Sequence, residues 1–163
     1  MQLIMIFETR ASCKSDYRYV KSAMDYFYVE RSYKRTPLFA SSKSELTNQE
    51  SKIKKYKGLY AGDSAVIICA DYDREDDENN APISLHCKRC GYELVWMNRN
   101  VEEVFLGKSV PSRQKEKEST AFLRKKETYL STIHTLDNKE PLLKHPSSNL
   151  LVVLDKYINR KHK

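Results

Sequence analysis

Short apolar runs alternate along the chain with segments whose pattern is helical. The runs, at residues 3–8, 36–40, 64–70 and 93–97, have the length and composition of buried strands. The segments between them, residues 15–28, 41–58 and 79–90, show helical spacing or begin with serine or proline and end near glycine. This alternation predicts an α/β fold, a parallel sheet of about four strands with helices on both faces.

The pattern changes after residue 98 and becomes helical. Helices are expected at residues 101–106, 112–130 and 150–158, and the loop at residues 134–149 is expected to be exposed. In the helix at residues 79–90, Pro82 is expected in the first turn and Gly91 just past the end. We predict an α/β domain over residues 1–107 and a basic helical extension over residues 108–163, packed on the same domain.

Length and composition favour one globular unit. The 163 residues are 40% hydrophobic, which is enough to bury a core. No run of 18 apolar residues is present, and the first apolar run leads into Glu8 and Arg10 instead of a cleavage site, so neither a membrane span nor a signal peptide is expected. Four cysteines with one close pair favour reduced thiols and a cytoplasmic location.

The net charge of +7 is concentrated in the last third of the chain. Residues 1–105 carry 16 Lys and Arg and 16 Asp and Glu, whereas residues 106–163 carry 13 basic and 6 acidic residues. Clustered basic residues gain from releasing the counterions condensed on a polyanion, which suggests a nucleic-acid partner. A solvated basic helix surface explains the same charge, and both interpretations stay open.

Three carboxylates are expected to meet at one rim of the sheet. Glu8 follows the first strand, Asp71 follows the third, and Asp73 can point back to the same place. Ligands bind outside the carboxyl ends of strands in α/β sheets, and converging carboxylates repel unless a cation lies between them. A hard divalent ion such as Mg²⁺ (or Mn²⁺) satisfies this requirement. A solvated acidic loop that caps the next helix is the alternative.

The pair Cys87-x-x-Cys90 has the spacing of zinc ligands, but Cys13 and Cys69 form no second pair. Because structural zinc sites need four ligands, a zinc site is the weaker interpretation.

The order of three short motifs resembles the Toprim fold, and in particular the small RloB-like proteins related to OLD-type nucleases. The motifs are ETRASCKSDYRYV from Glu8, ADYDRED from Ala70 and NRNVEEVFL from Asn98, and the resemblance covers roughly residues 3–107. Asn98 and Glu102 occupy polar positions of the family pattern. The register of the acidic motif is open, since Asp73 and Glu75 fit it as well as Asp71 and Asp73.

The resemblance implies a metal-dependent nuclease acting on DNA or RNA, in a phage-defence or mobile-element setting. Asp71 and Asp73 would hold the metal, Glu8 would act as general acid and base or as a further ligand, and Glu102 would support the site. The alternative is a non-catalytic nucleic-acid-binding or regulatory subunit that acts with an ATPase partner. Basic side chains would contact backbone phosphates; these are Arg10, Lys14, Arg113, Lys115, Lys117, Arg124, Lys125 and Lys126.

Overall fold

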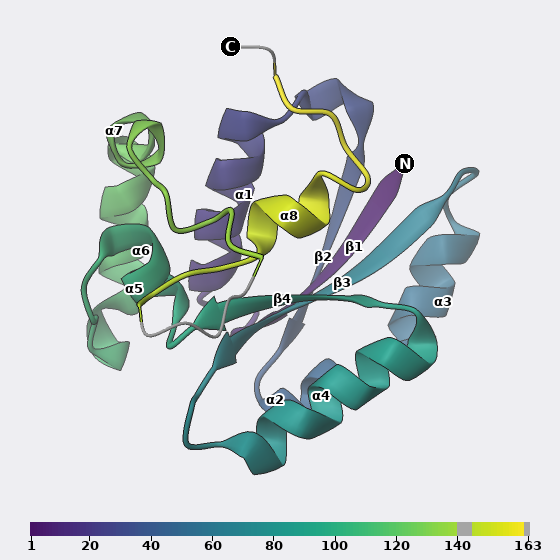
Figure 1. Cartoon of the computed structure of the whole chain (residues 1–163). Helices are drawn as coiled ribbons and strands as arrows, with labels where there is room; N and C mark the ends of the chain where they lie inside the picture. The colour runs from purple at the N-terminus through teal and green to yellow at the C-terminus, as the bar shows by residue number, and fades with distance from the viewer. Residues whose placement is uncertain (140–144, 162–163) are drawn as a thin grey trace.

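A single four-stranded sheet forms the centre of the molecule (Figure 1). The computed structural model describes residues 1–139 and 145–161. All strand pairs are parallel, and the strand order is β2-β1-β3-β4. The predicted α/β class with a parallel sheet of about four strands is confirmed. The strands are β1 (Gln2–Glu8), β2 (Lys34–Ala40), β3 (Ser64–Tyr72) and β4 (Glu93–Asn98).

Helices cover both faces of the sheet. One face carries α2, α3 and α4, and the other carries α1, α5, α6, α7 and α8 (Figure 1). The helices are α1 (Ser15–Phe27), α2 (Lys43–Leu46), α3 (Glu50–Gly58), α4 (Asp77–Cys90), α5 (Val101–Leu106), α6 (Lys115–Arg124), α7 (Lys126–Ser131) and α8 (Leu150–Leu154). In the described part of the chain, no helix is long and apolar enough to cross a bilayer.

Strand β1 is apolar along its whole length because both of its faces are buried. Leu3, Met5 and Phe7 pack on the face that α1 covers. Ile4 and Ile6 alternate with them and pack on the face that α2, α3 and α4 cover. A strand paired on both edges and covered on both faces reads as a continuous apolar run, which is the pattern that predicted it.

Two predicted helices differ in detail from the structure. Residues 41–58 form two helices, α2 and α3, instead of one. Helix α4 begins at Asp77, so Pro82 lies beyond the first turn, in contrast to the expectation. Gly91 ends α4 in the left-handed conformation, with φ of 66°, as its position after the helix predicted.

The segment before α8 is only in part the exposed loop that was expected, since His134, Asp137, Lys139 and His145 are exposed. Leu136 and Ser148 are buried, while residues 140–144 lie outside the described residues. The segment lies along the open edge of β4, where the Asn98 amide donates to the Ser147 carbonyl at 2.8 Å and the Trp96 amide donates to Asn149 Oδ1 at 2.9 Å. Backbone bonding to an edge strand buries this segment without an apolar pattern.

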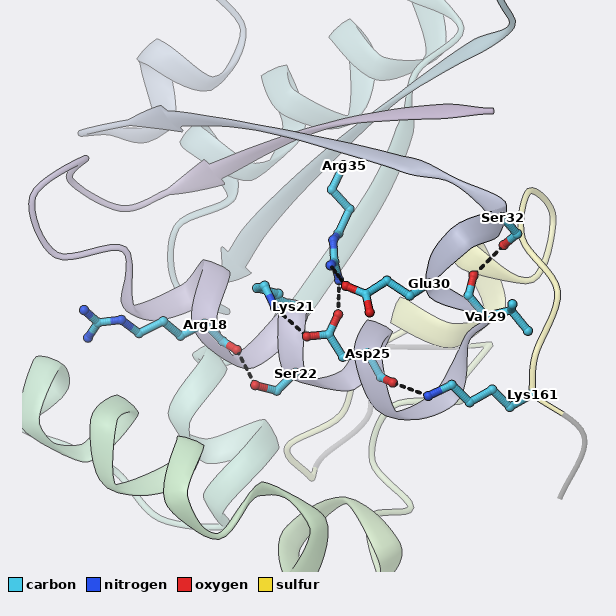
Figure 2. Close-up of polar contacts among 9 residues, drawn as sticks. All are labelled: Arg18, Lys21, Ser22, Asp25, Val29, Glu30, Ser32, Arg35 and Lys161. Atoms are coloured by element: carbon cyan, nitrogen blue, oxygen red, sulfur yellow. Dashed lines mark hydrogen bonds and ion pairs between the residues drawn. The ribbon is translucent and has the colours of Figure 1, made fainter.

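Residues after Phe105 pack against α1 and join the main core. Phe122 of α6 is buried and lies 4.7 Å from Tyr19 of α1, between ring centroids. The other end of α1 is held by Lys161, whose ammonium donates to the Asp25 carbonyl at 2.6 Å, while the Asp25 carboxylate accepts from Arg35 of β2 (Figure 2). The C-terminal helices and the sheet therefore share one hydrophobic core.

Truncating Phe122 to alanine is expected to destabilise the whole protein by about 3 kcal/mol, because it leaves a cavity between α1 and α6. The neighbouring variant Leu123→Ala is the control, since Leu123 is 40% exposed, and its cost is expected to be about 0.5 kcal/mol. Urea unfolding followed by circular dichroism checks both values. Two separate transitions in the wild type would contradict a shared core.

Candidate functional site

The strand order places a switch point between β1 and β3. The chain leaves β1 through α1 towards β2, and it leaves β3 through α4 towards β4 on the opposite face. Such a point opens a crevice at the carboxyl ends of the two strands. Glu8 is the last residue of β1, and Asp71 is the second-last residue of β3. The two carboxyl groups therefore lie at the position where α/β sheets bind ligands.

Asp16 adds a third carboxyl group from the first turn of α1. It accepts a hydrogen bond from Ser15 Oγ at 2.8 Å. Asp16 and Asp71 both line a cavity of about 10 Å³, whose apolar walls include Phe7 and Val101. Burial, opposed by the Ser15 hydrogen bond and reinforced by the charge of Glu102, raises the pKa of Asp16 to about 6.

Glu102 of α5 adds a fourth carboxyl group and is fully buried. Its Oε2 lies 3.0 Å from Lys115 Nζ, while its Oε1 has no hydrogen-bond partner among the described residues. Asn100 starts α5 by accepting the Glu103 amide on its side chain at 2.9 Å, which fixes the helix turn that carries Glu102. Lys115 is the first residue of α6, so the counter-charge comes from the C-terminal region.

Burial and the charges of neighbouring carboxylates both raise the pKa values of Asp71 and Glu8. Burial raises the pKa of Asp71 well above its usual range, and the neighbouring charges that act on it most strongly are Asp16, Lys115, Glu8 and Glu102. Burial also raises the pKa of Glu8 to about 7, although the Lys43 ammonium acts in the opposite direction. The cluster has a surplus of negative charge, which a bound cation would relieve.

Asp73 is exposed and pairs with a lysine, in contrast to the buried Asp71. Its side chain is 57% exposed, and its Oδ2 accepts from Lys43 Nζ at 2.9 Å. Lys43 also donates to Asp76 and to Asn80, each at 3.1 Å. Glu75 is exposed. Of the carboxylates in the acidic motif that were predicted as metal ligands, the structure brings Asp71 into the cluster and pairs Asp73 with Lys43.

The predicted phosphate-binding residues separate into three groups. Lys115 points inward to Glu102, as described above. Arg113, Lys117 and Arg124 line a groove of about 530 Å³ along α6. Among the rest, Lys126 is partly buried and Lys14 lies 5.7 Å from the centre of the Phe39 ring; the exposed side chains are Arg10, Lys14 and Lys125.

Sequence patterns did not predict a role for Asp16 or Lys43, and they did not predict that Lys115 points inward. Asp16 carried a weak signal, because the first turn of the helix after β1 lies at the same rim as Glu8. Lys43 lies in a polar segment, and only its contacts distinguish it from its neighbours.

Metal ligation by the cysteines finds no support in the described residues. Cys87 of α4 is buried in the apolar cluster on that face of the sheet. Cys90 Sγ lies 3.8 Å from His86 Nε2, and all four thiols are free. As the side chains stand in the part of the chain that the structure describes, no three His, Cys, Asp or Glu residues are grouped closely enough to hold a metal ion.

Comparison of the chain with models of protein families, with curated proteins and with solved structures gives no match. The functional interpretation therefore depends on the residues and their geometry.

Replacing Lys115 by methionine is expected to destabilise the protein by about 3 kcal/mol, because Glu102 is then buried without a counter-charge. Lys117→Met is the matched control on the exposed side of the same helix, with an expected change within about 0.5 kcal/mol. Urea unfolding measures both. The double variant E102Q/K115M should regain stability, and failure to do so would show that packing of the lysine stem matters more than charge.

Stability in metal-free buffer is expected to fall as the pH rises from about 4.5 to about 7. The folded pKa of Glu8 lies above its ordinary value of 4.5, so the folded state holds a proton that the unfolded chain releases in this range. Above pH 7 this contribution is constant. Urea unfolding at several pH values should show a shallower decline for Glu8→Gln than for the wild type, and no change of slope for the exposed Glu78→Gln.

Proposed function

We propose that the protein is a metal-dependent nuclease of the RloB and Toprim type, which hydrolyses phosphodiester bonds of DNA or RNA. The observation that carries the proposal is the cluster of Glu8, Asp16, Asp71 and Glu102 at the switch point of the sheet. A groove with three basic side chains runs along α6, the helix whose first residue, Lys115, contacts Glu102. The order of the acidic motifs along the chain is a second, independent support.

The donor chemistry suits a hard divalent cation, but the carboxylates would have to move closer together to bind one, because no three of the described side chains are grouped closely enough as they stand. Carboxylate oxygens are the ligands that Mg²⁺ and Mn²⁺ prefer. Glu8 Oε2 and Glu102 Oε1 are buried and lack hydrogen-bond partners among the described residues, so the cluster has unused acceptors as well as surplus charge. Asp71 would hold the cation, and Glu8 would act either as a further ligand or as the general acid and base. When bound, Mg²⁺ would polarise the scissile phosphate and stabilise the charge that develops on it.

Glu8 has the properties of a general acid and base. Its pKa of about 7 lets it take up a proton from a water molecule and return it to the leaving oxygen near neutral pH. Lys43 acts on Glu8 from the α2 side and holds Asp73, Asp76 and Asn80, so it keeps the acidic loop in position.

The groove along α6 would hold the substrate backbone. Arg113, Lys117 and Arg124 contribute three cations to this groove and can contact phosphates without reading sequence. Binding of this kind weakens strongly with salt, because it releases counterions.

The cellular setting follows from the resemblance. A role in phage defence or in a mobile element, in the cytoplasm and with an ATPase partner, is part of the proposal. The four free thiols are compatible with a reducing compartment.

Cleavage of labelled single-stranded and double-stranded DNA and RNA in Mg²⁺, in Mn²⁺ and in chelator tests the proposal. The wild type should cleave at least one substrate only with metal, and Asp71→Asn and Glu8→Gln should reduce the rate roughly a hundredfold or more. Glu78→Gln is the control, since Glu78 is an exposed carboxylate outside the cluster.

Other outcomes point to the alternatives. Salt-sensitive binding without cleavage would favour a nucleic-acid-binding subunit. Cleavage that persists in chelator and in Asp71→Asn would overturn the proposed active site.

A further inference from the structure

Helix α3 carries a second concentration of positive charge, on the opposite face of the sheet from the groove along α6 (Figure 1). Its nine residues include four lysines and one glutamate, whereas the ten residues of α6 include two lysines, one arginine and two glutamates. The four lysines of α3 are Lys52, Lys54, Lys55 and Lys57, and all of them are exposed. The even balance of charge over residues 1–105 therefore hides a strongly basic helix.

Carboxylates cancel little of this charge. Among the described residues, none of the four lysines forms an ion pair. Glu50, the single carboxylate of α3, accepts a hydrogen bond from the Tyr92 hydroxyl at 2.9 Å. Lys52 acts on the charge of Glu45, which is exposed. The positive field of the helix therefore extends into solvent.

Two tyrosine rings hold lysines at the edges of this surface. Lys57 Nζ lies 5.9 Å from the centre of the Tyr92 ring. Lys34 Nζ lies 5.5 Å from the centre of the Tyr60 ring, just past the end of α3. A ring attracts an ammonium group without neutralising it, so these contacts orient the lysines and preserve their charge. Lys34 extends the basic surface from α3 to the first residue of β2.

The hydrophobic core does not require these lysines. Helix α3 buries Ile53 against the sheet, while its lysines face solvent. Lys52 and Lys55, and likewise Lys54 and Lys57, are three residues apart on the helix, where like charges repel. The helix dipole favours Lys55 and Lys57 in the last turn, but it does not explain Lys52 and Lys54. A polyanion bound to this face would relieve the repulsion.

We propose that the exposed face of α3, together with Lys34, binds the phosphate backbone of a nucleic acid. This inference rests on the proposed function for the choice of nucleic acid among polyanions. A membrane surface fits less well, because the buried apolar residue of α3, Ile53, faces the core and does not reach a lipid layer. Since α3 and α6 lie on opposite faces of the sheet, one straight duplex cannot contact both, and each surface would bind its own segment (Figure 1).

Binding measurements in a chain with a neutralised α6 groove test the inference, because they isolate the contribution of α3. The background variant is Lys117→Gln with Arg124→Gln, and the probes are labelled single-stranded RNA and duplex DNA of about 20 base pairs, in chelator at several salt concentrations. Adding Lys54→Gln and Lys55→Gln should weaken binding roughly tenfold or more and lower the slope of log affinity against log salt by about 1.8, since two phosphate contacts are lost.

The matched control adds Lys139→Gln and Lys156→Gln to the same background, which removes the same charge from exposed positions outside α3. We expect the control to change the affinity less than about twofold and to leave the salt slope unchanged. Equal weakening in both variants would show an effect of net charge alone and overturn the inference. Loss of all binding in the background variant itself would do so as well.

A second measurement separates binding from folding. Lys54 and Lys55 are exposed, so their replacement should leave the circular dichroism spectrum and the urea midpoint unchanged. A lower midpoint would make these lysines structural residues and overturn the inference. Binding to phosphatidylserine vesicles that depends on Lys54 and Lys55, without binding of either nucleic acid, would overturn it in favour of a membrane surface.

The result is distinguishable from the outcome for the nuclease proposal. Binding that depends on Lys54 and Lys55, without cleavage of any substrate, would support this surface and reject the nuclease. Metal-dependent cleavage by a protein whose binding does not change when Lys54 and Lys55 are replaced would support the nuclease and reject this surface.

Discussion

The concentration of negative charge at the carboxyl ends of β1 and β3 is the constraint on which the rest of the structure depends. Buried carboxylates are costly unless a positive charge lies close to them. The chain supplies two lysines for this purpose, Lys43 from α2 and Lys115 from α6. Each approaches from a different element, and α6 must pack on α1 for Lys115 to reach Glu102. Hydrophobic packing and charge compensation therefore support each other.

The strands could be predicted because the residue types within each strand depend directly on whether its faces are buried. Residues buried on both faces must be apolar, so β1 and β3 appear as continuous runs whatever surrounds them. The polar helices α2 and α3 carry a weaker signal, because few of their residues face the core. Ser147 and Ser148 carried none, since their burial depends on backbone pairing with the edge of β4.

The site was predictable in part, for a similar reason. Glu8 and Asp71 are marked by their positions at the ends of apolar strands, and parallel strands bring such ends together. The partners of Asp73 and Glu102 depend instead on how helices pack, which the spacing of residues along the chain does not report. Asp16 was not predicted as a member of the site, because an aspartate in the first turn of a helix is common. Only the folded structure shows that it lines the same cavity as Asp71.

The position of Lys115 in the chain has a consequence for folding during synthesis. All carboxyl groups of the cluster lie at or before residue 102, and the ammonium against Glu102 follows them. The four strands are complete at Asn98 and α6 begins at Lys115, so the strands leave the ribosome before α6 does. For that interval the buried rim lacks one of its two lysines. Lys115, in the last third of the chain, therefore pairs with the buried Glu102 carboxylate only after the strands of the sheet have left the ribosome.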